Sequence, residues 1–223
     1  MYPCSGLDVP DVVQTFGDLF DTFLFVDIRY DFSRLNTPPV SGWEEVPGTR
    51  RLEGKPADHV RHLQSGRRHF RHVEPAWLRA DYLHLRSGRT IEICLRRGFG
   101  QYALQELTDG TMGMFLHRGD SSGEGGSGVM YLANRRLSHP PLSMLFDAIK
   151  QKLTMPALIA SDGSNTRIRE LSLAGGGDDS ITTFTRFGLL WQRNMNIARP
   201  GDRRITVVWS VSLCDPCGRA VSG

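Results

Sequence analysis

The sequence predicts an α/β fold built on a mixed sheet. Short, continuous apolar runs follow helical patterns near both ends of the chain, as in βαβ units. In the middle, from Ala80 to Ala133, apolar residues recur at every second position with turn residues between the runs, which is typical of antiparallel hairpins. A chain of 223 residues is long enough for one large core. We therefore expect a single α/β domain over residues 1–213 and a small, polar tail over residues 214–223.

The N-terminal segment predicts a strand, a helix and a second strand. An extended piece at Tyr2–Cys4 precedes apolar residues at helical spacing over Val9–Phe20, where Pro10 fits the first turn because its missing N–H is not needed there. The apolar run Phe23–Val26 predicts a strand buried on both faces, which ends at Asp27. The next stretch, residues 31–75, is rich in Pro, Gly, Arg and His, and we interpret it as a long excursion with one short helix near residues 56–63.

The middle of the chain predicts hairpins, and the C-terminal part predicts a second crossover. The hairpin turns are expected at Ser87-Gly88 and Asp109-Gly110, before a run at Met112–Leu116, a Gly-rich loop at Gly119–Gly128 and a further run at Val129–Ala133. An apolar stripe over Leu142–Leu153 predicts a helix that leads into a strand at Ala157–Ala160. A flexible loop at Leu173–Ser180 and a closing antiparallel pair, Ile181–Trp191 and Arg204–Leu213, complete the chain. Together these elements predict a Rossmann-like mixed sheet with antiparallel hairpins and flanking helices.

Composition favours a cytoplasmic protein. No apolar segment is long enough to cross a bilayer, and the N-terminus does not resemble a signal peptide, so we expect no membrane partner. Four scattered cysteines suit a reducing compartment. The formal charge is only +3, but Arg and His concentrate between Arg50 and Arg97. This segment is either a solvated face or a surface for a phosphate-bearing partner such as nucleic acid.

Ligands of open α/β sheets bind beyond the carboxyl ends of the strands, where loops and helix N-termini supply unpaired N–H groups. We therefore expect one shared opening formed by four polar clusters: Tyr2–Gly6, Asp27, His117–Asp120 and Ser161–Asn165.

Part of this pattern resembles a known family. The segment Tyr2–Gly6 leading into a helix, the strand that ends at Asp27, the polar stop at Asp120 and the final antiparallel pair resemble a class I S-adenosylmethionine-dependent methyltransferase. The resemblance implies that Ser5 and Gly6 approach the cofactor through a Gly-containing loop. It also implies that Asp27 binds the ribose hydroxyls and that Asp120 lies near the site of methyl transfer.

Two of the clusters allow a second interpretation. In the Gly-rich loop, backbone N–H groups can form an anion-binding nest, with His117 and Arg118 neutralising a phosphate, but Gly and Ser also suit a plain flexible loop. Asp162 can position a water as a base, with Ser164 and Asn165 binding a sugar or ribose, but the same residues are ordinary turn formers.

We expect no metal site. His59, His62, His69 and His72 form two His-x-x-His pairs without an evident third ligand, and Cys214 and Cys217 form at most half of a zinc site. The four tryptophans suit a core or the wall of a cleft.

The leading hypothesis is a nucleotide-cofactor protein, most concretely a methyltransferase-like protein that uses S-adenosylmethionine. One alternative is a non-catalytic module that binds nucleic acid or a nucleotide through the Arg-rich segment. Another is a hydrolase of a phosphorylated or glycosylated small molecule, with Asp120 and Asp162 as its catalytic carboxylates.

Overall fold

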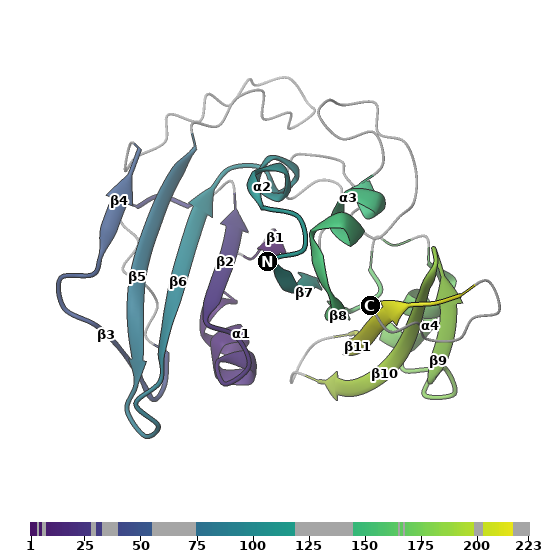
Figure 1. Cartoon of the computed structure of the whole chain (residues 1–223). Coiled ribbons are helices and arrows are strands. Elements are labelled where there is room, and N and C mark those ends of the chain that lie inside the picture. Colours follow the sequence, from purple (N-terminus) through teal and green to yellow (C-terminus); the bar gives the residue numbers. More distant parts are fainter. Residues whose placement is uncertain are drawn as a thin grey trace, which may run out of the picture. The chain divides into compact units, whose positions relative to one another are not determined.

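In the computed structural model of the chain, the described residues form two compact units, each with its own mixed sheet (Figure 1). The described residues of the first unit lie within Met1–Ala103, and those of the second lie within Leu104–Gly223. The expected α/β class is confirmed, but the strands are divided between two sheets instead of the single sheet that the sequence suggested. A single domain over residues 1–213 stays a prediction. The structure describes residues 1–3, 5, 8–27, 30–32, 40–54, 75–118, 145–164, 166, 168–198 and 203–215.

The sheet of the first unit joins a parallel part to an antiparallel part. Its order is β1-β2-β6-β5-β3, and β4 also pairs with β5. The strands β1, β2 and β6 are mutually parallel, whereas β5 runs antiparallel to β6 and to both β3 and β4. The bounds of the strands are β1 Tyr2–Pro3, β2 Thr22–Asp27, β3 Trp43–Glu45, β4 Arg51–Glu53, β5 Ala76–His84 and β6 Thr90–Arg97.

Helix α1 (Val9–Phe16) connects β1 to β2, as the apolar spacing predicted. It buries Val9, Val12, Val13 and Phe16, and it ends four residues before the expected Phe20. The end coincides with Gly17, which packs against the indole of Trp43 so closely that a Cβ would lie 2.7 Å from Trp43 Cζ2. A single face of α1 thus supplies much of the core of this unit.

The predicted hairpin of β5 and β6 is confirmed, and it turns at Gly88 with a φ of +71°. The excursion over residues 31–75 contains the two short strands β3 and β4, which the sequence analysis missed because their residues are mostly polar. Pairing with β5 gives these strands their extended conformation. The short helix expected near residues 56–63 lies outside the described residues.

The sheet of the second unit has the order β7-β8-β11-β10-β9. Strands β7 and β8 are parallel, as a crossover requires, and β11 lies antiparallel between β8 and β10. The closing antiparallel pair is thereby confirmed. The bounds are β7 Met112–His117, α3 Leu145–Lys152, β8 Leu153–Ser161, α4 Arg169–Gly175, β9 Thr183–Arg186, β10 Leu189–Ile197 and β11 Thr206–Leu213.

Three predicted elements need correction. Strand β7 does not form a hairpin with β6, because helix α2 (Gly100–Glu106) follows β6 and β7 pairs in parallel with β8. The expected loop at Leu173–Ser180 begins inside helix α4. The run Ile181–Trp191 is interrupted at Phe187 and Gly188, both with positive φ, so it forms a hairpin of β9 and β10. The predicted elements at Gly119–Gly128 and Val129–Ala133 and the first residues of the helix expected from Leu142 lie outside the described residues.

Aromatic rings form the centre of the second unit. Phe184 stacks on Trp191 at 5.2 Å between ring centroids and meets Trp209 edge to face at 5.1 Å. Phe146 of α3 adds a further ring on Trp191, and both of these side chains are fully buried. Within the part of the chain that the structure describes, no helix combines the length and the apolar character that a membrane crossing needs.

Candidate functional site

The carboxyl ends of three parallel strands align in the first unit. The register pairs Pro3 of β1 with Val26 of β2, and Asp27 of β2 with Arg97 of β6. The residues just beyond these positions therefore come together at one edge of the sheet, which is where a ligand of an α/β sheet binds. Ser5 and Asp27, two of the predicted cofactor residues, both lie at this edge, whereas Gly6 lies outside the described residues.

Hydrogen bonds hold the segment after β1 in place. The backbone N–H of Ser5 donates to the carbonyl of Val26 over 3.1 Å, and its hydroxyl shares a 2.5 Å hydrogen bond with the hydroxyl of Tyr30. Asp8 links the segment to α1, since its N–H donates to the Ser5 carbonyl and its carboxylate accepts a bond from the hydroxyl of Tyr2. Ser5 is therefore a positioned, buried residue in this edge of the sheet.

The electrostatics of this edge are set by burial and by two carboxylates. Burial raises the pKa of the Tyr30 hydroxyl, and the negative charges of Asp27 and Asp8 raise it further, against the opposing effect of the hydrogen bond from Ser5. Arg97 is fully buried next to this edge and donates a long, 3.5 Å bond to the Tyr30 carbonyl. Asp27, the last residue of β2, is half-buried at this edge.

A second group of predicted residues lies at the carboxyl ends of β7 and β8 in the second unit. His117, the last residue of β7, pairs in register with Ser161, the last residue of β8. The N–H of Asp162 donates to the His117 carbonyl over 3.3 Å. His117 is fully buried, and burial lowers the pKa of its imidazole to about 4, although the negative charge of Asp162 acts in the opposite direction.

The carboxylate of Asp162 organises the turn that follows β8. Its Oδ1 accepts hydrogen bonds from both the N–H and the hydroxyl of Ser164, at 2.9 and 2.6 Å. Its backbone carbonyl accepts a 2.6 Å bond from Arg204 Nε. These contacts favour the turn-forming interpretation of this cluster, and a catalytic role for Asp162 stays a prediction.

The structure thus assembles the predicted residues in two groups. Ser5 and Asp27 lie together in the first unit, and His117, Arg118, Asp162 and Ser164 lie at the strand ends of the second. The expectation of one opening assumed one sheet, and the division into two sheets removes that basis. Asp120 and Asn165 lie outside the described residues.

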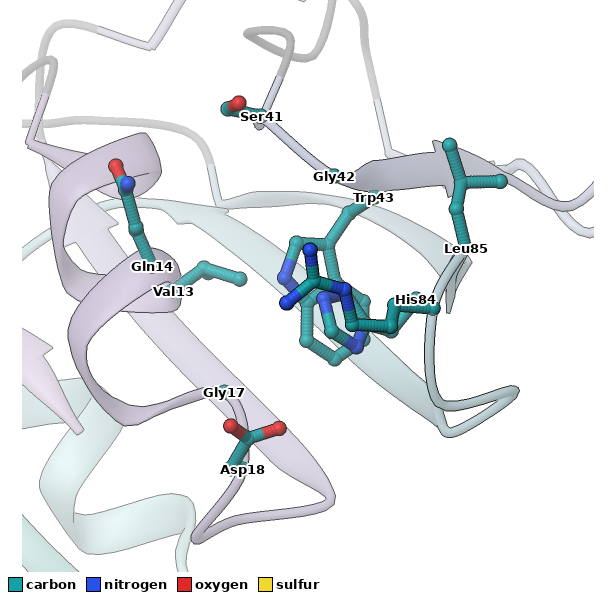
Figure 2. A pocket seen from close by; sticks show the side chains of 10 residues that line it. Val13, Gln14, Gly17, Asp18, Ser41, Gly42, Trp43, His84 and Leu85 are labelled. Atoms are coloured by element: carbon teal, nitrogen blue, oxygen red, sulfur yellow. The ribbon is translucent and has the colours of Figure 1, made fainter.

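A pocket that the sequence analysis missed lies elsewhere in the first unit (Figure 2). Its volume is about 400 Å³, and its walls come from α1 and the turn after it, from the loop before β3 and from the hairpin of β5 and β6. Trp43 was expected in a core or a cleft wall, and it lines this pocket while remaining largely buried. The other lining residues carry no sequence pattern, because loops distant in the sequence bring them together.

Among the described residues, no group of three or more His, Cys, Asp or Glu side chains is placed so that it could hold a metal ion. The four histidines of the predicted His-x-x-His pairs and Cys217 lie outside that part of the chain. The polar groups at the strand ends are carboxylates, hydroxyls and backbone groups, which suit recognition of hydroxyl and N–H groups.

In comparisons with known proteins, no family model, curated protein or solved structure matches this chain.

Proposed function

We propose that this chain is a methyltransferase-like protein that binds S-adenosylmethionine at the carboxyl ends of β1 and β2. The observation that carries the proposal is the juxtaposition of Ser5 and Asp27 on adjacent parallel strands, joined by the 3.1 Å bond from Ser5 N–H to Val26. In doubly wound sheets the loop after the first strand lies against the cofactor, and an acidic residue after the second binds the ribose. Ser5 and Asp27 occupy those two positions.

The strand orders of the two sheets support the same proposal. Doubly wound folds arrange their strands in the order 3-2-1-4-5-6, where the numbers follow the chain. In the first unit the parallel strands β6, β2 and β1 have the order 3-2-1. The second sheet likewise joins a parallel pair, β7 and β8, to an antiparallel strand, β11.

The residues at this edge fit the chemistry of the cofactor. Asp8 and Asp27 lie close enough to Tyr30 to act on its pKa, so two carboxylates accompany the segment after β1. Carboxylates accept hydrogen bonds from ribose hydroxyls and attract a positive sulfonium centre. When bound, S-adenosylmethionine supplies an electrophilic methyl group, while the chain's own residues bind and orient it.

Calorimetry of the full chain with S-adenosylmethionine and S-adenosylhomocysteine tests the proposal. We expect both to bind, and we expect Asp27→Asn to weaken binding about tenfold or more, since it removes a charge-assisted hydrogen bond. Asp147→Asn, at an exposed position of α3, is the matched control and should bind as the wild type does. Absence of heat at millimolar ligand, or an Asp27→Asn variant that behaves like the control, would contradict the proposal.

Six of the seven arginines in the described part of the Arg-rich segment are paired or buried, and the seventh, Arg86, is exposed. The ion pairs of this segment join arginines to Glu45, Glu92 and Asp21. The arginines in these pairs are Arg50, Arg51, Arg79 and Arg89. The two buried arginines are Arg96 and Arg97. Nucleic-acid binding depends on phosphate contacts from free cationic side chains, so these residues favour the cofactor proposal.

A further inference from the structure

The pocket of Figure 2 lies at the opposite edge of the first sheet from Ser5 and Asp27. Asp18 belongs to the turn that leads into the beginning of β2, and His84 ends β5, which runs antiparallel to β6. Both therefore mark the amino-terminal edge of the parallel strands. A ligand bound here would occupy a site separate from the proposed cofactor site.

Two aromatic side chains form a prearranged wall of this pocket. Trp43 pairs with His84 across β3 and β5, and their rings lie 4.7 Å apart at an interplanar angle of 33°. The hydroxyl of Ser87 shares a 2.7 Å hydrogen bond with Nδ1 of His84, and Gly17 closes against the indole from the side of α1. In Figure 2 the side chain of Val13 points from α1 toward these rings. The two rings are therefore held in place by contacts within the chain.

Hydrogen bonds from a neighbouring arginine, Arg89, connect two walls of the pocket. Arg89, in the hairpin of β5 and β6, donates to the backbone carbonyl of Asp18 over 2.5 Å and to the carboxylate of Asp21 over 2.8 Å. These bonds link the hairpin to the turn after α1, so the two sides of the pocket keep a fixed separation.

The rim of the pocket offers polar groups that the rest of the described chain does not use. The side chains of Gln14, Asp18, Ser41 and Arg86 all line the pocket. Among the described residues, none of these four side chains forms a hydrogen bond or an ion pair with another residue. The rim thus combines an acceptor-only carboxylate, an amide, a hydroxyl and a guanidinium around an aromatic wall.

We propose that this pocket binds a guanine nucleoside monophosphate. A volume of about 400 Å³ lies within the usual range for small-molecule sites. The base stacks on the half-buried ring of His84, which the indole of Trp43 supports from behind, as bases do on aromatic side chains in proteins. The guanine edge carries two N–H donors side by side, which match the carboxylate of Asp18, whereas adenine presents a donor beside an acceptor. Arg86 pairs with the phosphate.

The test is binding of GMP and AMP to the full chain, measured by calorimetry. We expect GMP to bind about tenfold more tightly than AMP. Asp18→Asn should lose that preference through a roughly tenfold weaker affinity for GMP, and Arg86→Gln should weaken both nucleotides by a similar factor. The matched controls, Asp147→Asn and Arg169→Gln, alter exposed charges of the second unit and should leave both affinities unchanged.

Any of the following results would overturn this assignment. They are no binding of GMP at millimolar concentration, equal affinity for GMP and AMP in the wild type, and pocket variants that behave like their controls. Measurements with S-adenosylmethionine separate the two proposals. Asp18→Asn should keep full affinity for that cofactor, and Asp27→Asn should keep full affinity for GMP. If Asp18→Asn instead weakens binding of S-adenosylmethionine, the pocket is the cofactor site and the assignment to GMP is wrong.

Discussion

Burial gives the thiol of Cys94 a chemistry different from that of an exposed cysteine. Cys94 lies in β6 with only 3% of its surface exposed. Desolvation is the main reason that the pKa of its thiol is raised to about 12, with the charges of neighbouring Arg and Glu side chains acting in both directions. Since the thiolate is the reactive form, Cys94 is structural rather than nucleophilic.

Alkylation with iodoacetamide at mildly alkaline pH should therefore spare Cys94 in the folded protein. We expect the peptide that contains Cys94 to be labelled only after denaturation, and the half-buried Cys214 to be labelled in the native state, as read by mass spectrometry. Labelling of Cys94 in the native protein as fast as in the denatured protein would show that β6 opens readily.

At the scale of elements, the connection from β8 to α4 depends on close backbone packing. Gly163 has a φ of +69°, and a Cβ there would overlap the carbonyl of Leu171 in α4. Gly175, at the end of α4, likewise has no room for a Cβ because the carbonyl of Asp162 fills that space. The predicted Asp-Gly turn is real, but its tight contact with α4 could not be read from the sequence.

Gly163→Ala and Gly177→Ala form a matched pair that tests this packing. Both glycines have positive φ, so each substitution should cost about 1–2 kcal/mol of folding free energy. Only Gly163 is crowded, because nothing lies within 4 Å of a Cβ at Gly177, so Gly163→Ala should cost about 1–3 kcal/mol more. Denaturant unfolding measures the difference, and equal losses would mean that the contact with α4 is loose.

Strands β10 and β11 each contribute a fully buried tryptophan, but the two indoles differ in their hydrogen bonds. Nε1 of Trp191 donates to the carbonyl of Arg186 over 3.4 Å. Nε1 of Trp209 has no hydrogen-bond partner within the described part of the chain. Burying an N–H group without a hydrogen bond costs free energy. This cost offsets part of the free energy gained by burying the Trp209 ring.

Substitution by phenylalanine should therefore lower the stability of the fold by different amounts at these two positions. We expect Trp191→Phe to lower the free energy of unfolding by about 1 kcal/mol more than Trp209→Phe, because only Trp191→Phe leaves a carbonyl without its donor. Denaturation monitored by circular dichroism compares the variants. A larger loss for Trp209→Phe would indicate that its indole N–H has a partner after all.

At the scale of the whole molecule, acid should destabilise the fold through His117. Its pKa falls from 6.5 to about 4 on folding, so the unfolded chain binds a proton in this range that the native chain does not. Stability is therefore complete above about pH 6.5, is lost as the pH falls toward 4, and changes no further below that value on account of this residue. The loss is on the order of 3 kcal/mol, since each pKa unit corresponds to about 1.4 kcal/mol.

Denaturant midpoints measured across this range should show the loss in the wild type and a much flatter profile in His117→Gln. The comparison uses the slope of the denaturant midpoint against pH. A loss of stability that is equal at every pH therefore does not affect the result. An unchanged slope in His117→Gln would assign the acid sensitivity to other groups.

The candidate site was predictable to the extent that local patterns mark strand ends. The runs before Asp27 and Ser161 are continuous and apolar, and each ends in the expected strand, so the polar residues after them lie at strand ends as predicted. The pocket with Trp43 and Arg86 was not predictable, because its walls come from three segments that only the folded chain brings together.

The sequence by itself determined the α/β class, the hairpin of β5 and β6 and the closing antiparallel pair, because these follow from the period of apolar residues within short segments. Only the tertiary structure decided the partner of β7, the short strands β3 and β4 and the division of the strands into two sheets. The physical reason is that an alternating strand such as Met112–Leu116 has the same side-chain pattern in a parallel or an antiparallel pair. Its partner is chosen by hydrogen bonds and packing between residues far apart in the chain.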